Sequence, residues 1–173
     1  MSSVVPAESV TPPLPVPDDF AVLWPVPTRW SDNDHYGHVN NVAYYSYFDT
    51  AINAWLMAAS GVDIRELDAI GIVAETACVF RRELSFPDAL EVGIGVERLG
   101  TRSIVYSPAI FRVGDDGERV LAATGRFVHV YVDRENRKPV SIPEPIRRVV
   151  ADLSASGADL IGTSTPGEPS GAQ

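Results

Sequence analysis

The first part of the chain carries one short alternating segment. Between Phe20 and Asp32, large side chains recur at every second position, which is the period of a β-strand. Two prolines, Pro25 and Pro27, interrupt the segment. Proline has no backbone N–H, and residues two apart direct their N–H groups to the same side. Both missing donors therefore lie along one side of the strand, and that side cannot pair fully with a neighbour. We predict that this strand lies at the edge of a sheet.

Residues 40–60 carry the period of a buried α-helix. Apolar positions recur there every three or four residues, and the stripe is wide enough to cover most of the circumference. Asn40 is the predicted N-cap and Gly61 the predicted C-cap. A helix that is apolar on most sides must be covered, so we expect a sheet to wrap around it. A short second helix is expected over Val62 to Ala69.

The second half of the chain alternates between apolar and polar positions. Four strands are predicted, over Ile72 to Phe86, Leu90 to Leu99, Ser103 to Val113 and Arg119 to Asp133. Pro108 interrupts the third strand, and the turn at residues 114–117 predicts a hairpin between the last two. One strand, one long helix and four antiparallel strands indicate an α+β fold. Ile142 to Leu153 predicts a short C-terminal helix.

Composition adds the domain boundaries. The 173 residues are enough for one domain with a sizeable core, which we place at residues 18–153. Met1 to Pro17 and Ser154 to Gln173 are rich in Pro, Ser or Gly, and both are predicted to be flexible tails.

Charge and cysteine content narrow the class of protein. A net charge of −9 argues against a general nucleic-acid binder, which needs a basic face. The single cysteine, Cys78, excludes an internal disulfide and a cysteine-based zinc cluster. The chain shows no secretion signal and no apolar run that could span a bilayer. We therefore expect a cytoplasmic protein without a membrane partner.

Candidate chemistry is concentrated between Arg29 and Asp49. Two carboxylates, Asp32 and Asp34, and a glycine turn precede the long helix. The positive end of a helix dipole and unpaired backbone N–H groups gather at such a position. A carboxylate beside a site that can hold an oxyanion is suited to attack an activated acyl group. A carboxylate in this position can equally cap the turn or the helix.

A metal site is an alternative use of the same segment. His35 and His38, together with Asp32 and Asp34, resemble a ligand cluster. Such clusters usually include a further, distant ligand, and the one remaining histidine, His129, lies on a late predicted strand. We therefore expect no metal.

The segment closely resembles the 4-hydroxybenzoyl-CoA thioesterase family of hotdog-fold proteins. The resemblance covers most of the chain to about Pro145 and is carried by Asp34, Gly37, His38, Val39, Asn40, Asn41 and Tyr44. It implies a hotdog fold, in which a curved antiparallel sheet wraps around one long central helix. It also implies an acyl-CoA thioesterase that works as a homodimer or a dimer of dimers, with active sites built between paired subunits.

The resemblance also implies roles for these residues. Asp34 would be the nucleophile or the general base, and the backbone N–H of Asn41 would hold the oxyanion. Gly37, His38, Asn40 and Tyr44 would support the site, and we expect His38 to hydrogen-bond across the turn and hold its shape. Asp32 is expected either to tune Asp34 or to be a solvated residue at the end of the strand. Glu75 is a second choice for catalysis, because a different hotdog subgroup uses an acidic residue from its helix, whereas Glu75 is predicted on a strand.

A turn between two predicted strands matches the family's coenzyme A phosphate site. Arg102 matches a basic position, with Thr101 and Ser103 beside it, whereas Gly100 and Thr101 replace basic residues found in some members. Coenzyme A would be part of the substrate, and no other cofactor is implied. The carrier could also be acyl carrier protein, and the acyl chain is left open. A non-catalytic acyl-binding protein and a hotdog dehydratase or hydratase are the rival interpretations.

Overall fold

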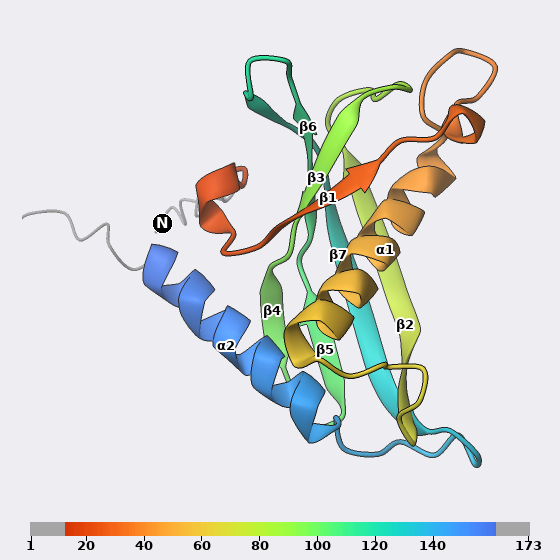
Figure 1. Cartoon of the computed structure of the whole chain (residues 1–173), viewed down its shortest axis with the longest axis vertical. Helices are drawn as coiled ribbons and strands as arrows, with labels where there is room; N and C mark the ends of the chain where they lie inside the picture. Colours follow the sequence, from red (N-terminus) through yellow and green to blue (C-terminus); the bar gives the residue numbers. More distant parts are fainter. Residues whose placement is uncertain (1–12, 162–173) are drawn as a thin grey trace, which may run out of the picture.

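One curved antiparallel sheet, a helix of 20 residues and a second helix of 18 residues make up most of the molecule (Figure 1). The computed structural model describes residues 13–161; residues 1–12 and 162–173, which fall in the predicted tails, lie outside the described part. The helices are η1 (Pro17–Asp19), η2 (Trp30–Asp32), α1 (Asn41–Ser60) and α2 (Glu144–Ile161). The strands are β1 (Leu23–Pro27), β2 (Ala69–Phe80), β3 (Ala89–Gly93), β4 (Val96–Leu99), β5 (Ser103–Tyr106), β6 (Ala109–Val113) and β7 (Arg119–Asp133).

The long strand β7 organises the sheet. On one side β2 pairs with it along nearly its whole length, and on the other side β6 and then β5 pair with successive parts of it. The sheet continues through β3 to β1 beyond β6, and through β4 beyond β5. The predicted position of the first strand is confirmed, because β1 pairs only with β3 among the described strands. The strand β2 forms the opposite edge.

The helix α1 lies across the sheet as its wide apolar stripe predicts (Figure 1). Both predicted caps are confirmed. The side chain of Asn40 accepts a hydrogen bond from the Val42 N–H at 3.0 Å, and Gly61 takes a left-handed conformation with φ of 69°. The fit is close at Gly125 of β7, where an added Cβ would lie 2.7 Å from the ring of Phe48. This architecture is the α+β hotdog fold that the resemblance implied.

Two predicted strands are each divided in the structure. The segment from Leu90 to Leu99 forms β3 and β4, and the segment from Ser103 to Val113 forms β5 and β6. The two breaks face each other, because the Ser107 N–H donates to the Gly95 carbonyl at 2.9 Å. The carbonyl of Pro108 then accepts from the Gly125 N–H of β7 at 2.7 Å. These paired breaks let the sheet bend around α1.

One predicted helix and several predicted boundaries were wrong. The strand predicted between Phe20 and Asp32 is limited to Leu23–Pro27, and Trp30–Asp32 forms η2. The segment from Val62 to Ala69 is not a helix, because Asp63 accepts from the Arg65 N–H and forms a local turn. The strand β2 ends at Phe80 rather than Phe86, since the N–H groups of Arg81 and Arg82 both turn to the single carbonyl of Ala122. The last helix continues to Ile161, past the predicted end at Leu153, so the predicted tail boundary at Ser154 lies within α2.

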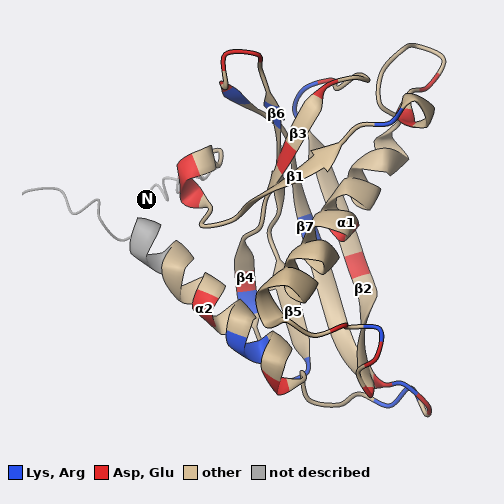
Figure 2. Cartoon of the chain, viewed as in Figure 1, with Lys and Arg blue, Asp and Glu red and all other residues tan. Residues whose placement is uncertain are grey.

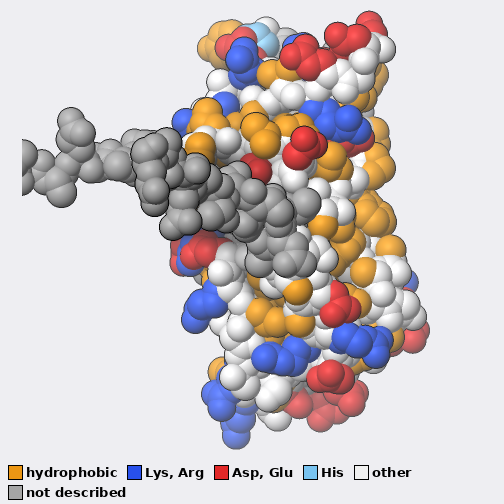
Figure 3. Space-filling model, turned by 90° about the vertical axis from the view of Figure 1, so that its left-hand side faces the viewer, with side chains coloured by type: hydrophobic (Ala, Val, Ile, Leu, Met, Phe, Trp, Pro, Cys, Tyr) orange, Lys and Arg blue, Asp and Glu red, His pale blue; other side chains and the backbone are white. Residues whose placement is uncertain are grey.

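Charged residues lie mainly in the loops at the two ends of the sheet and on α2 (Figure 2). Acidic and basic side chains are interspersed on the face shown in Figure 3, and hydrophobic side chains gather along its right-hand margin. No helix within residues 13–161 is both long enough and apolar enough to cross a membrane.

Candidate active site

The loop that precedes α1 is closed by backbone hydrogen bonds. Asn33 and Val39 form an isolated bridge, and the Asp34 N–H donates to the His38 carbonyl at 2.8 Å. Inside this loop the Gly37 N–H donates to the Asp34 carbonyl at 3.2 Å. Gly37 has φ of 81°, a conformation that side-chain-bearing residues avoid. The glycine of the motif is therefore required by the turn itself.

The carboxylate of Asp34 is held by the loop that follows it. Its Oδ1 accepts hydrogen bonds from the N–H groups of Tyr36, at 2.8 Å, and His38, at 3.3 Å. Within the described part of the chain, Oδ2 makes no hydrogen bond. The residue is half-buried, so one carboxylate oxygen fixes the orientation while the other remains available.

The start of α1 provides an unpaired amide. The Val42 N–H is taken by the Asn40 side chain, and the Ala43 N–H donates to the Asn40 carbonyl at 2.9 Å. The N–H of Asn41, the first helical residue, has no hydrogen-bond partner among residues 13–161. Asn41 is exposed, so this N–H at the positive end of the helix dipole is placed to receive an anion.

A cavity of about 320 Å³ adjoins this helix start. It is lined by His38, Val39, Asn41, Tyr44, Phe80, Arg81, Arg82 and Glu83. The buried ring of Tyr44 packs edge-on against Phe80 with 5.0 Å between centroids, and its hydroxyl donates to the Arg82 carbonyl at 3.4 Å. Burial raises the pKa of Tyr44, which keeps the phenol neutral. The structure thus brings His38, Asn41 and Tyr44 to one cavity, with Asp34 in the adjoining loop.

Two sequence expectations for this loop need correction. The imidazole of His38 does not cross the turn; its Nε2 lies 3.3 Å from Oε2 of Glu83, and the backbone closes the turn instead. Asp32 is not solvated, because its side chain is only 3% exposed and accepts from Arg29 and from the Tyr47 hydroxyl. Burial raises its pKa, but the hydrogen bonds from Arg29 and Tyr47 outweigh burial and hold the pKa below its ordinary value.

The turn with Thr101, Arg102 and Ser103 lies at the opposite end of the sheet. The Arg102 carbonyl accepts from the Tyr131 N–H, whereas Phe80, which lines the cavity near Asn41, pairs with Ala123. Tyr131 and Ala123 both lie on β7, eight residues apart, a separation that spans roughly 26 Å along a strand. Within one chain, the structure therefore does not bring the predicted phosphate site to Asp34.

The remaining candidates do not join the site. Glu75 lies on β2 and forms an ion pair with Arg126 of β7. Within residues 13–161, no group of three histidine, cysteine, aspartate or glutamate residues is arranged to hold a metal ion. A larger apolar cavity of about 620 Å³ lies between η1 and α2, and Asp34 and Asn41 do not line it.

Sequence reasoning missed the residues that complete the cavity wall. Phe80 and Glu83 were expected within a strand, and the end of β2 gave no recognisable signal. The hydrogen bond from the Tyr47 hydroxyl to Asp32 was only weakly indicated by the sequence. The indication was that Tyr47 lies one turn after Tyr44 on the apolar stripe of α1.

Comparisons with known proteins add an independent line of evidence. A family model described as the thioesterase-like superfamily matches residues 28–150. The crystal structure of the PA5185 protein from Pseudomonas aeruginosa strain PAO1 is similar, with 43% sequence identity and a TM-score of 0.77. That match covers 82% of this chain and 97% of the other.

Two further matches are more distant than the PA5185 structure. The uncharacterized protein YsmA of Bacillus subtilis (strain 168) is 25% identical over 122 residues, which is 70% of this chain and 80% of YsmA. The crystal structure of a mutant 4-hydroxybenzoyl CoA thioesterase in complex with 4-hydroxybenzoyl CoA gives a TM-score of 0.66. It is 14% identical and covers 75% of this chain and 97% of the other, so this likeness shows the fold alone.

Proposed function

Because this chain belongs to the thioesterase-like superfamily, we propose that it hydrolyses an acyl-CoA thioester to a free acid and a thiol. The match confirms the family expected from the Asp34 motif. One observation carries the proposal: among residues 13–161, one carboxylate oxygen of Asp34 and the Asn41 N–H at the start of α1 both lack a hydrogen-bond partner. These are the two groups that acyl transfer from a thioester requires.

The proposed reaction uses Asp34 and Asn41 in sequence. The thioester carbonyl oxygen accepts the Asn41 N–H, and the helix dipole stabilises the negative charge that develops on this oxygen. Asp34 either attacks the carbonyl carbon or removes a proton from a water molecule that attacks it. The carbon–sulfur bond then breaks and the thiolate leaves without strong acid assistance. If Asp34 attacks directly, water hydrolyses the resulting anhydride and regenerates the carboxylate.

A dimer through β2 would complete this site. Four apolar side chains of this edge strand, Ile72, Val73, Val79 and Phe80, are each between 41% and 49% exposed. An exposed apolar edge strand is a surface for pairing with another strand. Antiparallel pairing of two β2 strands about a twofold axis places the Ala69 end of one strand beside the Phe80 end of the other. The Arg102 turn of each subunit would then approach the Asp34 loop of its partner.

In the proposed dimer, Arg102 would bind the coenzyme A phosphates. Arg102 is exposed at the turn between β4 and β5, and no acidic side chain pairs with it among residues 13–161. We expect Thr101, Arg102 and Ser103 to contact these phosphates from across the interface. In a chain with a net charge of −9, a local guanidinium is needed to attract a polyanionic substrate.

The proposed function is tested by replacing the carboxylate. Asp34→Asn keeps the size of the side chain and its Oδ1 acceptor, so the fold should be unchanged by circular dichroism. The turnover number kcat for thiol release should fall at least about a hundredfold, because a positioned catalytic group is lost. Asp115→Asn, in the exposed β6–β7 turn, is the matched control and should keep normal turnover.

Thiol release should be assayed with short, long, branched and aromatic acyl-CoAs and with acyl carrier protein thioesters. If a folded Asp34→Asn protein turns over normally, Asp34 is not the catalytic carboxylate and Glu75 is tested next. If the wild-type protein binds acyl-CoA without releasing thiol, it is a binding protein and the proposal is wrong.

A further inference from the structure

Two buried polar atoms lack hydrogen-bond partners within residues 13–161, and they belong to neighbouring residues. They are the hydroxyl of Tyr106 and Nε2 of His129, whose rings pack edge-on with 5.2 Å between centroids. His129 is only 2% exposed. Nearly all buried polar groups in native proteins are hydrogen-bonded, so these two atoms call for an explanation.

One of these residues, His129, lines a cavity. The cavity has a volume of about 270 Å³ and lies between the second half of α1, the loop at residues 62–68 and the neighbouring ends of β2 and β7. Its wall combines apolar and polar residues, namely Asn53, Leu56, Ile64, Arg65, Leu67, Ala69, Ile70, Gly71, His129, Tyr131, Arg134 and Ile146. Tyr106 is not part of this wall, so of these two residues only His129 contributes to it.

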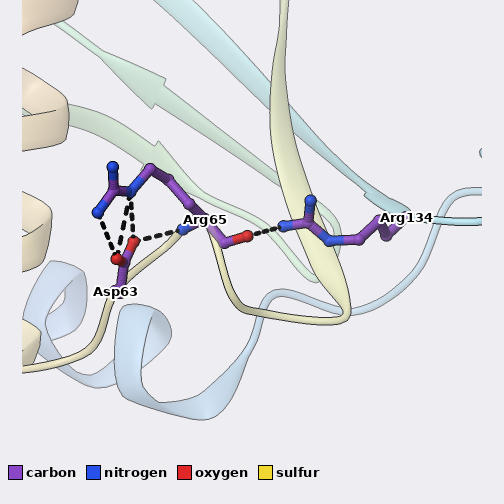
Figure 4. A network of polar contacts seen from close by, with 3 residues as sticks. All are labelled: Asp63, Arg65 and Arg134. Carbon is purple, nitrogen blue, oxygen red and sulfur yellow. Dashed lines mark hydrogen bonds and ion pairs between the residues drawn. The ribbon is translucent and has the colours of Figure 1, made fainter.

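The two arginines of the wall hold the loop that closes the cavity (Figure 4). Arg65 pairs with Asp63 at 2.6 Å, and its hydrogen bonds lower the pKa of Asp63 to about 2. Arg134 donates to the carbonyls of Arg65, at 2.5 Å, and Leu67, at 2.9 Å. Because these guanidinium donors are engaged with the loop, the cavity is better suited to a neutral polar group than to a phosphate.

The proposed dimer connects this cavity to the catalytic residues. Ala69, Ile70 and Gly71 form its wall at the start of β2. Antiparallel β2 pairing places this end beside Phe80 and Arg81 of the partner subunit, and in each chain those residues line the cavity at Asn41. In such a dimer, an acyl group held at Asn41 of one subunit would extend toward the cavity beside His129 of the other.

We propose that this cavity receives the acyl part of the substrate and that His129 selects acyl groups with a hydrogen-bonding substituent, such as a hydroxyl. The inference rests on the proposed thioesterase function. Burial lowers the pKa of His129, and the negative charge of Asp49 opposes this shift, so the imidazole is neutral near pH 7. A neutral imidazole offers one donor and one acceptor. A plain hydrocarbon chain would leave the imidazole unpaired, which disfavours it relative to a hydroxylated chain.

The test compares substrates that differ by one hydroxyl group. Butyryl-CoA is paired with 3-hydroxybutyryl-CoA, and benzoyl-CoA with ring-hydroxylated benzoyl-CoAs. The wild-type protein should favour a hydroxylated member by roughly two- to tenfold in kcat/KM, the size of one net hydrogen bond. His129→Phe should bring this ratio close to one, whereas His129→Gln, which keeps a donor and an acceptor, should restore part of it.

Tyr106→Phe is the matched control. It removes the other unpaired buried polar atom, which does not line the cavity, so the substrate ratio should stay at the wild-type value. Thermal unfolding of each variant shows whether it is folded. A folded His129→Phe protein with an unchanged ratio would overturn the proposal, and so would a wild-type protein without preference in either pair.

Failure of the proposed function is distinguishable from failure of this inference. If the wild-type protein releases thiol neither from these thioesters nor from the wider set of acyl-CoA and acyl carrier protein thioesters, the thioesterase proposal fails. Calorimetric binding of the matched free acids, with and without the hydroxyl, then tests the cavity directly. Equal affinities in wild-type and His129→Phe proteins would reject the site.

Discussion

At the scale of single residues, Asp32 and Asp34 show how two similar carboxylates acquire different uses. Both precede α1, yet Asp32 is buried with Arg29 and Tyr47 whereas Asp34 holds an exposed turn. The sequence predicts the turn and its glycine because backbone geometry demands them locally. It does not reveal which carboxylate is buried, since Tyr47 reaches Asp32 only after α1 has formed.

Asp32→Asn should therefore affect stability. The substitution removes the charge that Arg29 and Tyr47 stabilise in a buried position, and the free energy of unfolding should fall by about 1–3 kcal/mol at pH 7. The folded pKa of Asp32 is below its ordinary value, so its stabilising effect is present above about pH 4 and is lost as the pH falls through the folded pKa. Urea unfolding at several pH values should show the wild-type advantage shrinking below pH 4.

The control for this prediction is Asp152→Asn. Asp152 lies exposed on α2, and an exposed substitution of this kind should change the free energy of unfolding by less than about 0.5 kcal/mol. An Asp32→Asn protein as stable as the wild type at pH 7 would show that the Arg29–Asp32–Tyr47 contacts contribute nothing to stability.

At the scale of elements, periodicity predicted the long helix, its two caps and the hairpin at residues 114–117. Pro108 marked an interruption of the third strand, but nothing in the sequence predicted the facing break at Gly95, because that break depends on pairing within the sheet and on the curvature needed to cover α1. Nor did it predict the end of β2, where two consecutive N–H groups turn to one carbonyl. Local sequence thus specifies elements well, and tertiary contacts set where they stop.

The contact between β7 and α1 gives a prediction at this scale. Gly125→Ala would place a Cβ 2.7 Å from the buried Phe48 ring, and the resulting strain should cost about 1–3 kcal/mol. In contrast, Gly157 lies within α2, and no atom of the described part of the chain lies within 4 Å of an added Cβ. Gly157→Ala should stabilise by up to about 1 kcal/mol, since alanine favours helices.

The melting temperature Tm should therefore fall for Gly125→Ala and rise for Gly157→Ala. A shift of about 2–4 °C is expected for each kcal/mol in a domain of this size. If Gly125→Ala is as stable as the wild type, α1 and β7 do not pack as closely as the structure shows.

At the scale of the whole molecule, the position of Arg102 requires an explanation. The resemblance assigns it to the same site as Asp34, but the fold places the two at opposite ends of β7. This separation was not visible in the sequence, where only the order of elements can be read. A dimer with antiparallel β2 strands reconciles the two, since each site would then take Asp34 from one subunit and Arg102 from the other.

The reconciliation predicts subunit complementation. Arg102→Ala should raise KM for acyl-CoA several-fold, because a cation near the phosphates is lost, and it should leave acyl-pantetheine, which lacks the nucleotide phosphates, unaffected. When Arg102→Ala and Asp34→Asn proteins are unfolded together and refolded as a mixture, mixed dimers form. One site of each mixed dimer then has both Asp34 and Arg102, and the other site has neither.

Assays at low acyl-CoA concentration should therefore recover roughly a quarter of the wild-type activity from an equal mixture, if subunits pair at random. The KM of this recovered activity should equal the wild-type value. Light scattering checks that the mixture is dimeric or larger, and a β2 variant such as Val79→Lys, which places a charge on the pairing strand, should abolish both assembly and recovery. A mixture that shows only the raised KM of Arg102→Ala would mean that the two residues do not meet across the interface, and a stable, active monomer would exclude the shared site altogether.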